Sequence, residues 1–326
     1  MQDRGGIYSI LHHGATLPAS LRFDFDISSS MGLKSAFHLE LRIIDGWSVS
    51  VAREECRIEN PGGEEHFYVV EDGDVRGSAP VFPAVSADRI FLANASGLPE
   101  FRLLFEFLAN LQWTEPATPA LYQLIEQSNQ RSRRLSAQTE ATGLAARFRD
   151  LGKSQPDRLE IIQQYLRAVA PPFDRVEVIE TNGTLWLRFV EKSLSGESMP
   201  FYVSQASGGL VNSAEILLEL FTLPGEGKPA SPVLIEEPEA LLHPGAIQVI
   251  RDSFIEASRT RQVLVTTHSP DLLDATSISA DSIRIVYRDE TGTHIETLDP
   301  GTESVIRDRL YSAGQLLRQG GLSLKP

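Results

Sequence analysis

The amino-acid sequence predicts an α/β protein with an N-terminal antiparallel β subdomain, a helical insertion and a C-terminal parallel βαβ core. Three observations support this order. Apolar and polar residues alternate in the N-terminal part, apolar residues recur at helical spacing in the middle, and two short apolar strands flank a helix nearer the C-terminus. The changes of pattern divide the chain into residues 1–97, 98–172 and 173–326.

The N-terminal part shows period-two alternation. Phe23 and Phe25 alternate with Asp24 and Asp26, and a second run from Phe37 to Ile43 repeats the pattern. Strands with this alternation turn one face to the core and the other to water. The sequence therefore predicts an antiparallel sheet with one wet face.

The middle of the chain changes to helical spacing, which extends from about Leu98 to Ala170. Phe101, Leu104 and Leu108 fall on one face of a helix. Farther along, Asn182-Gly183 separates two apolar runs. Asn-Gly tolerates the positive φ of a type I′ turn, so this dipeptide predicts a β-hairpin.

The C-terminal part contains a strand, a helix and a second strand. The strands cover 233–235 and 263–265, and the helix between them places Ile247, Ile250 and Phe254 on one face. Such a βαβ unit predicts parallel strands that are neighbours in one sheet. A final helix is expected near 304–311.

Composition and charge exclude several classes of protein. The single cysteine, Cys56, rules out an intramolecular disulfide and a thiolate metal cluster. No apolar run approaches the roughly 20 residues of a membrane span, and the N-terminus has no signal-peptide core, so we expect a cytoplasmic protein without a membrane partner. A net charge of −14 argues against a globally basic nucleic-acid binder and still allows a local basic groove.

Two carboxylates directly follow the apolar strand at 233–235. Glu236 and Glu237 stand directly before Pro238, which ends the strand. An unpaired buried carboxylate is costly, so either a divalent cation or polar ligand is their partner, or they reach solvent in the next loop. The parallel topology places them with His268 at the carboxyl edge of the sheet, where open α/β sheets bind ligands.

At that edge the three residues could divide the chemistry of a nucleotide site. Glu236 could hold a metal or its bound water, Glu237 could orient and deprotonate an attacking water, and His268 could touch a terminal phosphate. A lone histidine at a strand end is more often a local hydrogen-bond partner. The context Thr-Thr-His-Ser-Pro favours the functional interpretation.

A second candidate site is the tripeptide Ser207-Gly208-Gly209, which opens a predicted helix. A helix N-terminus with small residues exposes backbone N–H groups at the positive end of the helix dipole and suits an anion. The same tripeptide is also an ordinary loop and helix cap.

Together and in this order, these motifs resemble the nucleotide-binding head of ABC-type ATPases, in the branch that includes RecF-like, SMC-like and OLD-type proteins with an AAA-type core. Ser207-Gly208-Gly209 is similar to the signature motif, Val233 to Glu237 to the Walker B strand, and His268 to the switch histidine. Glu-Glu-Pro-Glu, Leu-His-Pro and Thr-His-Ser-Pro match a variant of this family. Further similar segments are Arg4–Gly14, Phe148–Val178 and Leu310–Leu322.

The resemblance implies ATP and Mg²⁺ as ligands, with a Mg²⁺-linked role for Glu236 and a catalytic role for Glu237. It implies contact of Ser207-Gly208-Gly209 with the ATP of a facing subunit, and hence a homodimer or heterodimer of ATPase heads, with DNA as a further possible partner. DNA repair, phage defence and toxin-linked functions all use such heads.

The sequence departs from the family pattern at the phosphate-binding loop. It contains no Gly-x-x-x-x-Gly-Lys-Ser/Thr motif, and Gly152-Lys153-Ser154 is preceded at the required position by Arg147 instead of glycine. Glu236 replaces the usual aspartate, and His243 replaces the aspartate that usually ends the D-loop.

Three hypotheses follow. The chain could be an ATPase head whose N-terminal Walker A lobe is missing, and then inactive alone. It could be a non-hydrolysing regulatory module that supplies its signature motif to a partner ATPase. A nuclease of the OLD type is disfavoured, because no further acidic metal cluster follows the head. An upstream Walker A motif would support the first hypothesis, and ATP-driven heterodimerisation would support the second.

Overall fold

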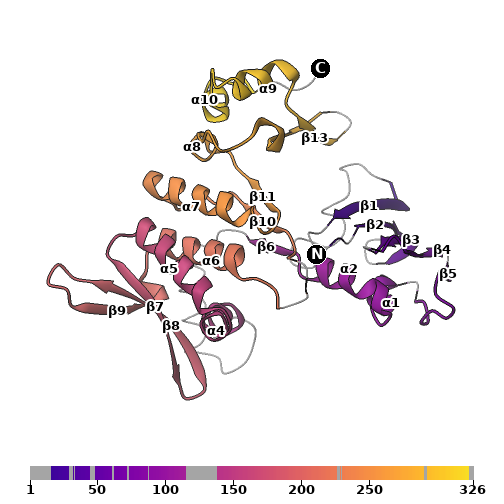
Figure 1. Ribbon diagram of the computed structural model, residues 1–326, viewed down its shortest axis with the longest axis horizontal. Coiled ribbons are helices and arrows are strands. Elements are labelled where there is room, and N and C mark those ends of the chain that lie inside the picture. The colour runs from indigo at the N-terminus through magenta and orange to yellow at the C-terminus, as the bar shows by residue number, and fades with distance from the viewer. Residues whose placement is uncertain are drawn as a thin grey trace. The chain divides into compact units, whose positions relative to one another are not determined.

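The computed structural model describes residues 16–28, 32, 34–44, 48–60, 62–71, 73–86, 88–114, 138–225, 228, 230–289 and 292–322. The chain divides into two compact units (Figure 1). The N-terminal unit ends at Asn110 and also takes Pro224–Ala230. The C-terminal unit comprises Leu111–Leu223 and the chain from Ser231 onward. The predicted similarity of Arg4–Gly14 lies outside the described residues.

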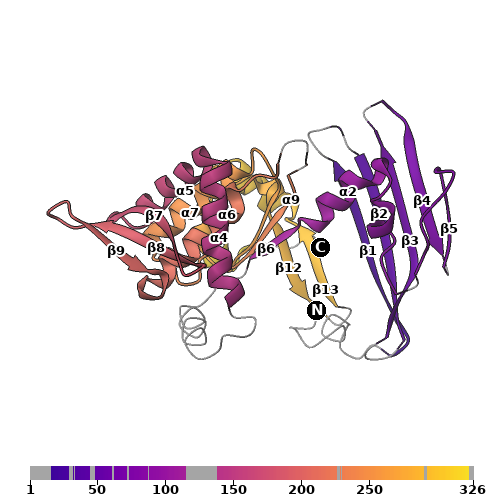
Figure 2. The same cartoon turned by 90° about the horizontal axis from the view of Figure 1, so that it is seen from below.

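The N-terminal unit is built on a five-stranded antiparallel sheet whose strands follow one another in chain order, as the alternation predicts. Phe37, Leu39 and Leu41 are buried on its apolar face. The helices pack on that face through Phe101 and Leu104 (Figure 2). The strands are β1 (Ala19–Ser28), β2 (Lys34–Ile43), β3 (Val49–Glu59), β4 (Glu65–Glu71) and β5 (Asp74–Gly77), and the helices are α1 (Leu92–Ala95) and α2 (Pro99–Ala109).

One carboxylate is buried in this unit. Glu54 accepts hydrogen bonds from the Tyr68 hydroxyl at 2.7 Å and from the backbone N–H groups of Phe91 and Leu92 at 2.6 and 2.7 Å. Burial raises the pKa of Glu54, while these three donors oppose the rise. The Glu54 carboxylate therefore connects the sheet to the start of α1 by hydrogen bonds.

The C-terminal unit contains the predicted parallel core. Strand β10 (Val233–Glu236) lies between β11 (Val263–Thr266) and β6 (Gln112–Thr114), and all three are parallel. Helix α7 (Pro244–Ala257) connects β10 to β11. Strand β6 is a correction to the predicted helical spacing of 98–170. With three residues, β6 is too short to show an alternation of apolar and polar side chains. These residues form a strand because they pair with β10.

Helices from the middle of the chain pack together in the C-terminal unit. They are α4 (Gln138–Ser154), α5 (Pro156–Val169) and α6 (Gly208–Phe221). Phe148, Ile162, Leu217 and Phe221 share one core with Ile235 of the parallel sheet. The Gly-Lys-Ser sequence at 152–154 ends α4 and is therefore helical in this structure.

A three-stranded antiparallel sheet completes this part. Strand β8 (Thr184–Lys192) lies between β7 (Phe173–Thr181) and β9 (Ser198–Tyr202), and the short helix η3 (Val203–Gln205) follows. The predicted hairpin is confirmed, because Asn182 and Gly183 adopt φ of 53° and 75° between paired strands. Both values are positive, as a type I′ turn requires.

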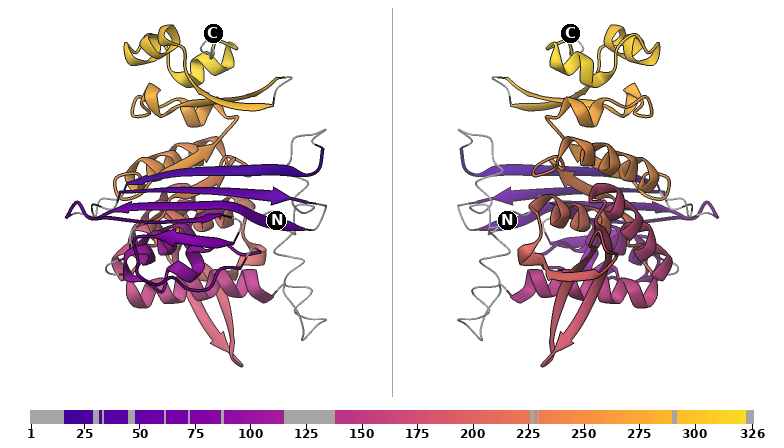
Figure 3. Two further views of the ribbon diagram at one scale, coloured as in Figure 1. Left: turned by 90° about the vertical axis from the view of Figure 1, so that its right-hand side faces the viewer. Right: turned by 90° about the vertical axis from the view of Figure 1, so that its left-hand side faces the viewer.

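The C-terminal elements, from residue 270 onward, are drawn in orange to yellow in Figure 3. The predicted final helix is α9, which begins earlier, at Pro300, because Asp299 caps it. Helix α10 was not expected. It is held to α8 by ion pairs of Arg318 with Asp271 and Asp274. The elements are α8 (Pro270–Leu273), η4 (Ala280–Ser282), β12 (Arg284–Arg288), β13 (Thr293–Thr297), α9 (Pro300–Arg307) and α10 (Ala313–Arg318).

A buried arginine ties β10 to the helices. Arg261 donates from Nε and Nη2 to the Ser231 carbonyl at 2.9 and 2.7 Å, and from Nη1 to the Glu219 and Thr222 carbonyls at 2.8 and 3.2 Å. Burial lowers the pKa of Arg261, and the nearby Glu219 carboxylate opposes this. The Arg261 side chain thus holds Ser231, just before β10, close to the C-terminal end of α6.

The carboxyl group of Glu215, on α6, makes the stability of the unit depend on pH. Burial, and secondarily the charge of Glu219, raises the pKa of Glu215 to about 7. The folded state therefore holds a proton that the unfolded state releases. The resulting stabilisation is complete below the ordinary glutamate pKa of 4.5 and is lost as pH rises through about 7.

We expect Glu215→Gln to stabilise the protein at pH 8 by about 1–3 kcal/mol, because the amide carries no charge to desolvate. Urea unfolding between pH 5 and 8, followed by circular dichroism, measures this. The variant should show a flatter pH profile than the wild type, whereas replacing the exposed Glu180 by glutamine should not flatten it. Parallel profiles for wild type and Glu215→Gln would contradict the assignment.

None of the helices in the described part of the chain has the length and apolar character needed to cross a membrane.

Candidate functional site

The candidate catalytic edge of the C-terminal unit consists of Glu236, Glu237 and His268. Glu236 is the last residue of β10 and pairs in register with Thr266, the last residue of β11. The backbone N–H of Glu237 donates to the Thr266 carbonyl at 2.9 Å. The parallel pairing therefore brings the acids and the histidine to the same end of the sheet.

Glu237 and His268 lie side by side at this edge. Glu237 Oε1 is 3.8 Å from His268 Nε2, and their side chains are 58% and 92% exposed. Both groups can therefore meet a ligand that approaches the sheet from solvent. Their proximity joins two motifs that are 31 positions apart in the sequence.

The backbone at Glu237 is unusual. Its φ of 39°, like that of Leu241 at 67°, lies in the left-handed region that non-glycine residues seldom adopt. Such conformations cost of order 1–3 kcal/mol and cluster at functional sites. The loop 237–243, which carries both residues, we call the acidic loop.

The donor set at this edge fits Mg²⁺ shared with a nucleotide. Carboxylate oxygens are its preferred protein ligands, and Mg²⁺ commonly uses one or two of them together with phosphates and waters. Glu236 is half-buried at the strand end and Glu237 is adjacent. Within the described ranges no group of three metal-binding side chains forms a cage, so the fit is to a shared ion.

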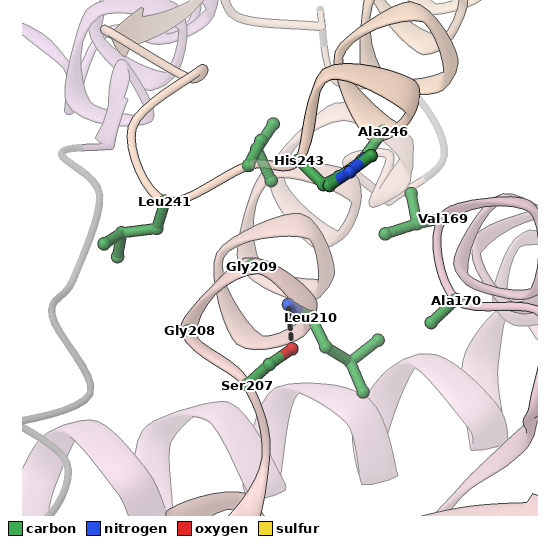
Figure 4. A pocket seen from close by; sticks show the side chains of 10 residues that line it. Val169, Ala170, Ser207, Gly208, Gly209, Leu210, Leu241, His243 and Ala246 are labelled. Carbon is green, nitrogen blue, oxygen red and sulfur yellow. Dashed lines mark hydrogen bonds between the residues drawn. The ribbon is translucent and has the colours of Figure 1, made fainter.

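The second candidate site opens at the start of α6. Ser207, Gly208 and Gly209 line a pocket of about 310 Å³ with Leu241, Leu242 and His243, and with Val169 and Ala170 at the end of α5 (Figure 4). Ser207 caps α6, since its hydroxyl accepts a hydrogen bond from the Leu210 N–H at 3.3 Å. The helix N-terminus and the pocket together suit an anionic group.

The two candidate sites are separate in this chain. Neither Glu236, Glu237 nor His268 lines the pocket at Ser207. The acidic loop connects them, because Glu237 begins it at the sheet edge and Leu241 to His243 reach the pocket. The structure thus pairs Glu237 with His268, while Ser207-Gly208-Gly209 lines a separate pocket.

The contacts of two residues in this region were not predicted from the sequence. Glu239 Oε1 accepts hydrogen bonds from the Thr267 hydroxyl at 2.6 Å and from the His268 and Ser269 N–H groups at 3.1 Å each. His243 caps α7, with Nδ1 accepting from the Gly245 N–H at 3.2 Å. The proline that follows it, at the first helical position, is the sequence signal that a helix begins here. The signal for Glu239 is the third acid of Glu-Glu-Pro-Glu.

Gly209 is required by packing against the acidic loop. A Cβ atom at this position would lie 2.8 Å from the Leu241 carbonyl oxygen. We expect Gly209→Ala to destabilise the protein by about 1–3 kcal/mol, because backbone must move to admit the methyl group. Urea unfolding measures the change.

Gly143→Ala on α4 is the matched control for this substitution. An added Cβ there meets no atom within 4 Å, so alanine should stabilise the helix by about 0.5–1 kcal/mol. If the two alanine variants had equal stability, the close approach of Gly209 to Leu241 would be wrong.

Comparison with known proteins places the chain in a family. Residues 110–274, half of the chain, match the family described as "AAA domain, putative AbiEii toxin, Type IV TA system". The matched range contains all the candidate site residues. No curated protein matches the chain.

The chain is also similar in structure to heads of SMC ATPases. The SmcHead bound to the C-winged helix domain of ScpA has a TM-score of 0.40 and 13% identity, covering 84% of this chain and 78% of that chain. The SMC head domain from Thermotoga maritima has a TM-score of 0.35 and 11% identity, covering 81% of this chain and 74% of that chain. The third structure is a Smc head domain with an extended coiled coil, bound to the C-terminal domain of ScpA derived from Pyrococcus furiosus. It has a TM-score of 0.34 and 13% identity, covering 86% of this chain and 82% of that chain.

At such scores these likenesses are remote, and the family rests on the domain match. That match confirms the resemblance to a nucleotide-binding ATPase head drawn from Ser207-Gly208-Gly209, Glu236-Glu237 and His268. The chain belongs to this family of AAA domains.

Proposed function

We propose that the chain acts as an ABC-type ATPase head that hydrolyses ATP with Mg²⁺ together with a second head. The observation that carries the proposal is the approach of Glu237 to His268 at the carboxyl end of the parallel sheet, 3.8 Å apart. Glu236 would hold Mg²⁺, Glu237 would act on the attacking water, and His268 would contact the terminal phosphate.

The chain's own residues supply distinct steps. Glu237 can orient a water and take its proton, because its carboxylate is exposed and its backbone is held to Thr266. His268, beside it, can donate a hydrogen bond to a phosphate oxygen. Bound Mg²⁺ would neutralise phosphate charge, and Glu236 at the strand end is placed to hold it. Ser207-Gly208-Gly209 would contact the nucleotide of the facing head.

Phosphoryl transfer depends chiefly on holding the β- and γ-phosphates. The 326-residue sequence contains no Walker A motif. We therefore propose that turnover requires a phosphate-binding loop supplied by another polypeptide segment or a partner head, and that this chain alone is inactive.

The test mixes the purified chain with an AAA-family head that carries a Walker A motif. Phosphate release and size-exclusion chromatography are followed with Mg²⁺-ATP, for each protein alone and for the mixture. We expect ATP-dependent association and turnover above the sum of the two. If the mixture shows neither association nor added turnover, the proposal fails.

A non-hydrolysing regulatory module is the alternative. The pocket at Ser207-Gly208-Gly209, which is separate from the catalytic edge, favours it. In that case Ser207→Arg would abolish ATP-driven association and the stimulation of the partner. Glu237→Gln would leave that stimulation unchanged, whereas the hydrolytic proposal requires a loss.

The family description names a putative AbiEii toxin and a type IV TA system, and it therefore favours a toxin-linked setting over DNA repair. We propose that the chain acts in the cytoplasm. Growth of cells expressing it, with and without its neighbouring genes, tests the setting, and DNA-stimulated ATP turnover tests a role for DNA.

A further inference from the structure

We propose that Glu239 is a positioning residue that holds His268 in place for the hydrolysis proposed above, so this inference rests on that function. One carboxylate oxygen of Glu239 accepts three hydrogen bonds from the segment 267–269, two of them from consecutive backbone N–H groups. Hydrogen bonds to an ionised acceptor are roughly twice as strong as neutral ones. Glu239 therefore fixes the backbone from which the His268 side chain projects.

The exposure of His268 makes this backbone anchor decisive. With 92% of its side chain in solvent, the ring gains little placement from packing. Thr267 strengthens the anchor, because its hydroxyl donates to Glu239 and accepts from the Ser269 N–H at 2.9 Å. The position of the ring beside Glu237 thus depends on where Glu239 holds the chain.

Glu239 is itself held by a fixed loop. Within the acidic loop, the Ala240 N–H donates to the Glu237 carbonyl at 2.9 Å, and the Leu242 N–H to the Glu239 carbonyl at 3.0 Å. Fully buried Asn212 on α6 donates from Nδ2 to the Pro238 and Ala240 carbonyls at 3.3 and 3.0 Å. Glu239 therefore connects the His268 segment to the helix that begins with Ser207-Gly208-Gly209.

The segment beyond His268 has its own support. Arg251 on α7 donates from Nη1 to the Asp274 carbonyl at 3.0 Å, and α10 contacts α8 through Arg318. Loss of Glu239 should therefore release 267–269 while α8 stays in place. This allows its role to be separated from general unfolding.

The first experiment compares the full chain with Glu239→Ala, Glu239→Gln and the control Glu177→Ala. Glu177 is another half-buried carboxylate of the same unit, paired with Arg175 and Arg188. Hydrogen exchange is measured by mass spectrometry over 266–270. Ring signals of ¹³C-labelled histidine are recorded by NMR, with His268 assigned from His268→Gln.

In Glu239→Ala we expect exchange of the His268 and Ser269 amides to rise at least about tenfold, since their charge-assisted bonds are lost, and the His268 ring signal to move. Glu239→Gln, which keeps one acceptor oxygen, should show a smaller change. Glu177→Ala should match the wild type. Unchanged exchange and an unchanged His268 signal in Glu239→Ala would overturn the proposal.

The second experiment uses the turnover assay described above. Glu239→Ala should lower kcat by roughly 10–100-fold with KM within about threefold, because a misplaced catalytic group slows chemistry more than binding. Glu239→Gln should recover part of kcat. Normal kcat in a variant whose 267–269 segment is released would refute positioning. If the wild-type mixture has no turnover, the proposed function fails, and exchange and NMR still decide whether Glu239 places His268.

Discussion

Replacing Glu237 by glutamine is expected to lower kcat for ATP hydrolysis by roughly 100- to 10,000-fold while nucleotide affinity stays within about threefold. The amide has the shape of the carboxylate but cannot accept the proton of the attacking water. Hydrolysis stops after nucleotide-driven association, so the associated heads should accumulate. Phosphate release and size-exclusion chromatography with Mg²⁺-ATP measure both effects in the mixture with a Walker A-containing head.

Glu177→Gln is the matched control for this experiment. It removes one negative charge from a half-buried glutamate on the β7–β8 hairpin, where Arg175 and Arg188 pair with it. Its turnover should equal that of the wild type. Comparable hydrolysis by Glu237→Gln and Glu177→Gln would show that another group acts as the base.

The second large effect is on stability. We expect Arg261→Ala to reduce the free energy of unfolding by about 3–5 kcal/mol, because the Ser231, Glu219 and Thr222 carbonyls lose their shared donor in a buried site. Urea unfolding monitored by circular dichroism gives the change, and proteolysis should become faster in the C-terminal unit.

Arg261→Lys and Arg259→Ala are the control variants for this prediction. Lysine keeps the charge, but its compact ammonium cannot replace the planar fork that reaches three carbonyls, so only part of the stability should return. Arg259 is exposed and lies just after α7, two residues before Arg261. The free energy of unfolding of its alanine variant should stay within about 0.5 kcal/mol of the wild type. Similar losses for Arg259→Ala and Arg261→Ala would indicate that charge, not the hydrogen bonds, matters.

The parts of the fold that follow a period could be predicted from the sequence. Alternation in β1 and β2, the apolar face of α7 and the Asn182-Gly183 turn each leave a local pattern, and the structure confirms them. Strand β6 leaves no such pattern. Its three residues become a strand because β10 offers them a parallel partner, which no local sequence window contains.

The candidate site divides in the same way. The proximity of Glu237 and His268 follows from parallel topology, since two neighbouring strands end at one edge. Glu239 and Arg261 could not be found in this manner. Both bind mainly backbone groups, and any sequence presents backbone N–H and carbonyl groups. Tertiary folding therefore decides which of these groups become their partners.

The left-handed backbone at Glu237 has a consequence for protein engineering. Glycine adopts a φ of 39° without steric cost, so a selection for thermal stability alone would favour Glu237→Gly. The same change would delete the proposed base. At this one position, a more heat-resistant protein and a working ATPase require different amino acids, and variants chosen by melting temperature should be checked for turnover before they are kept.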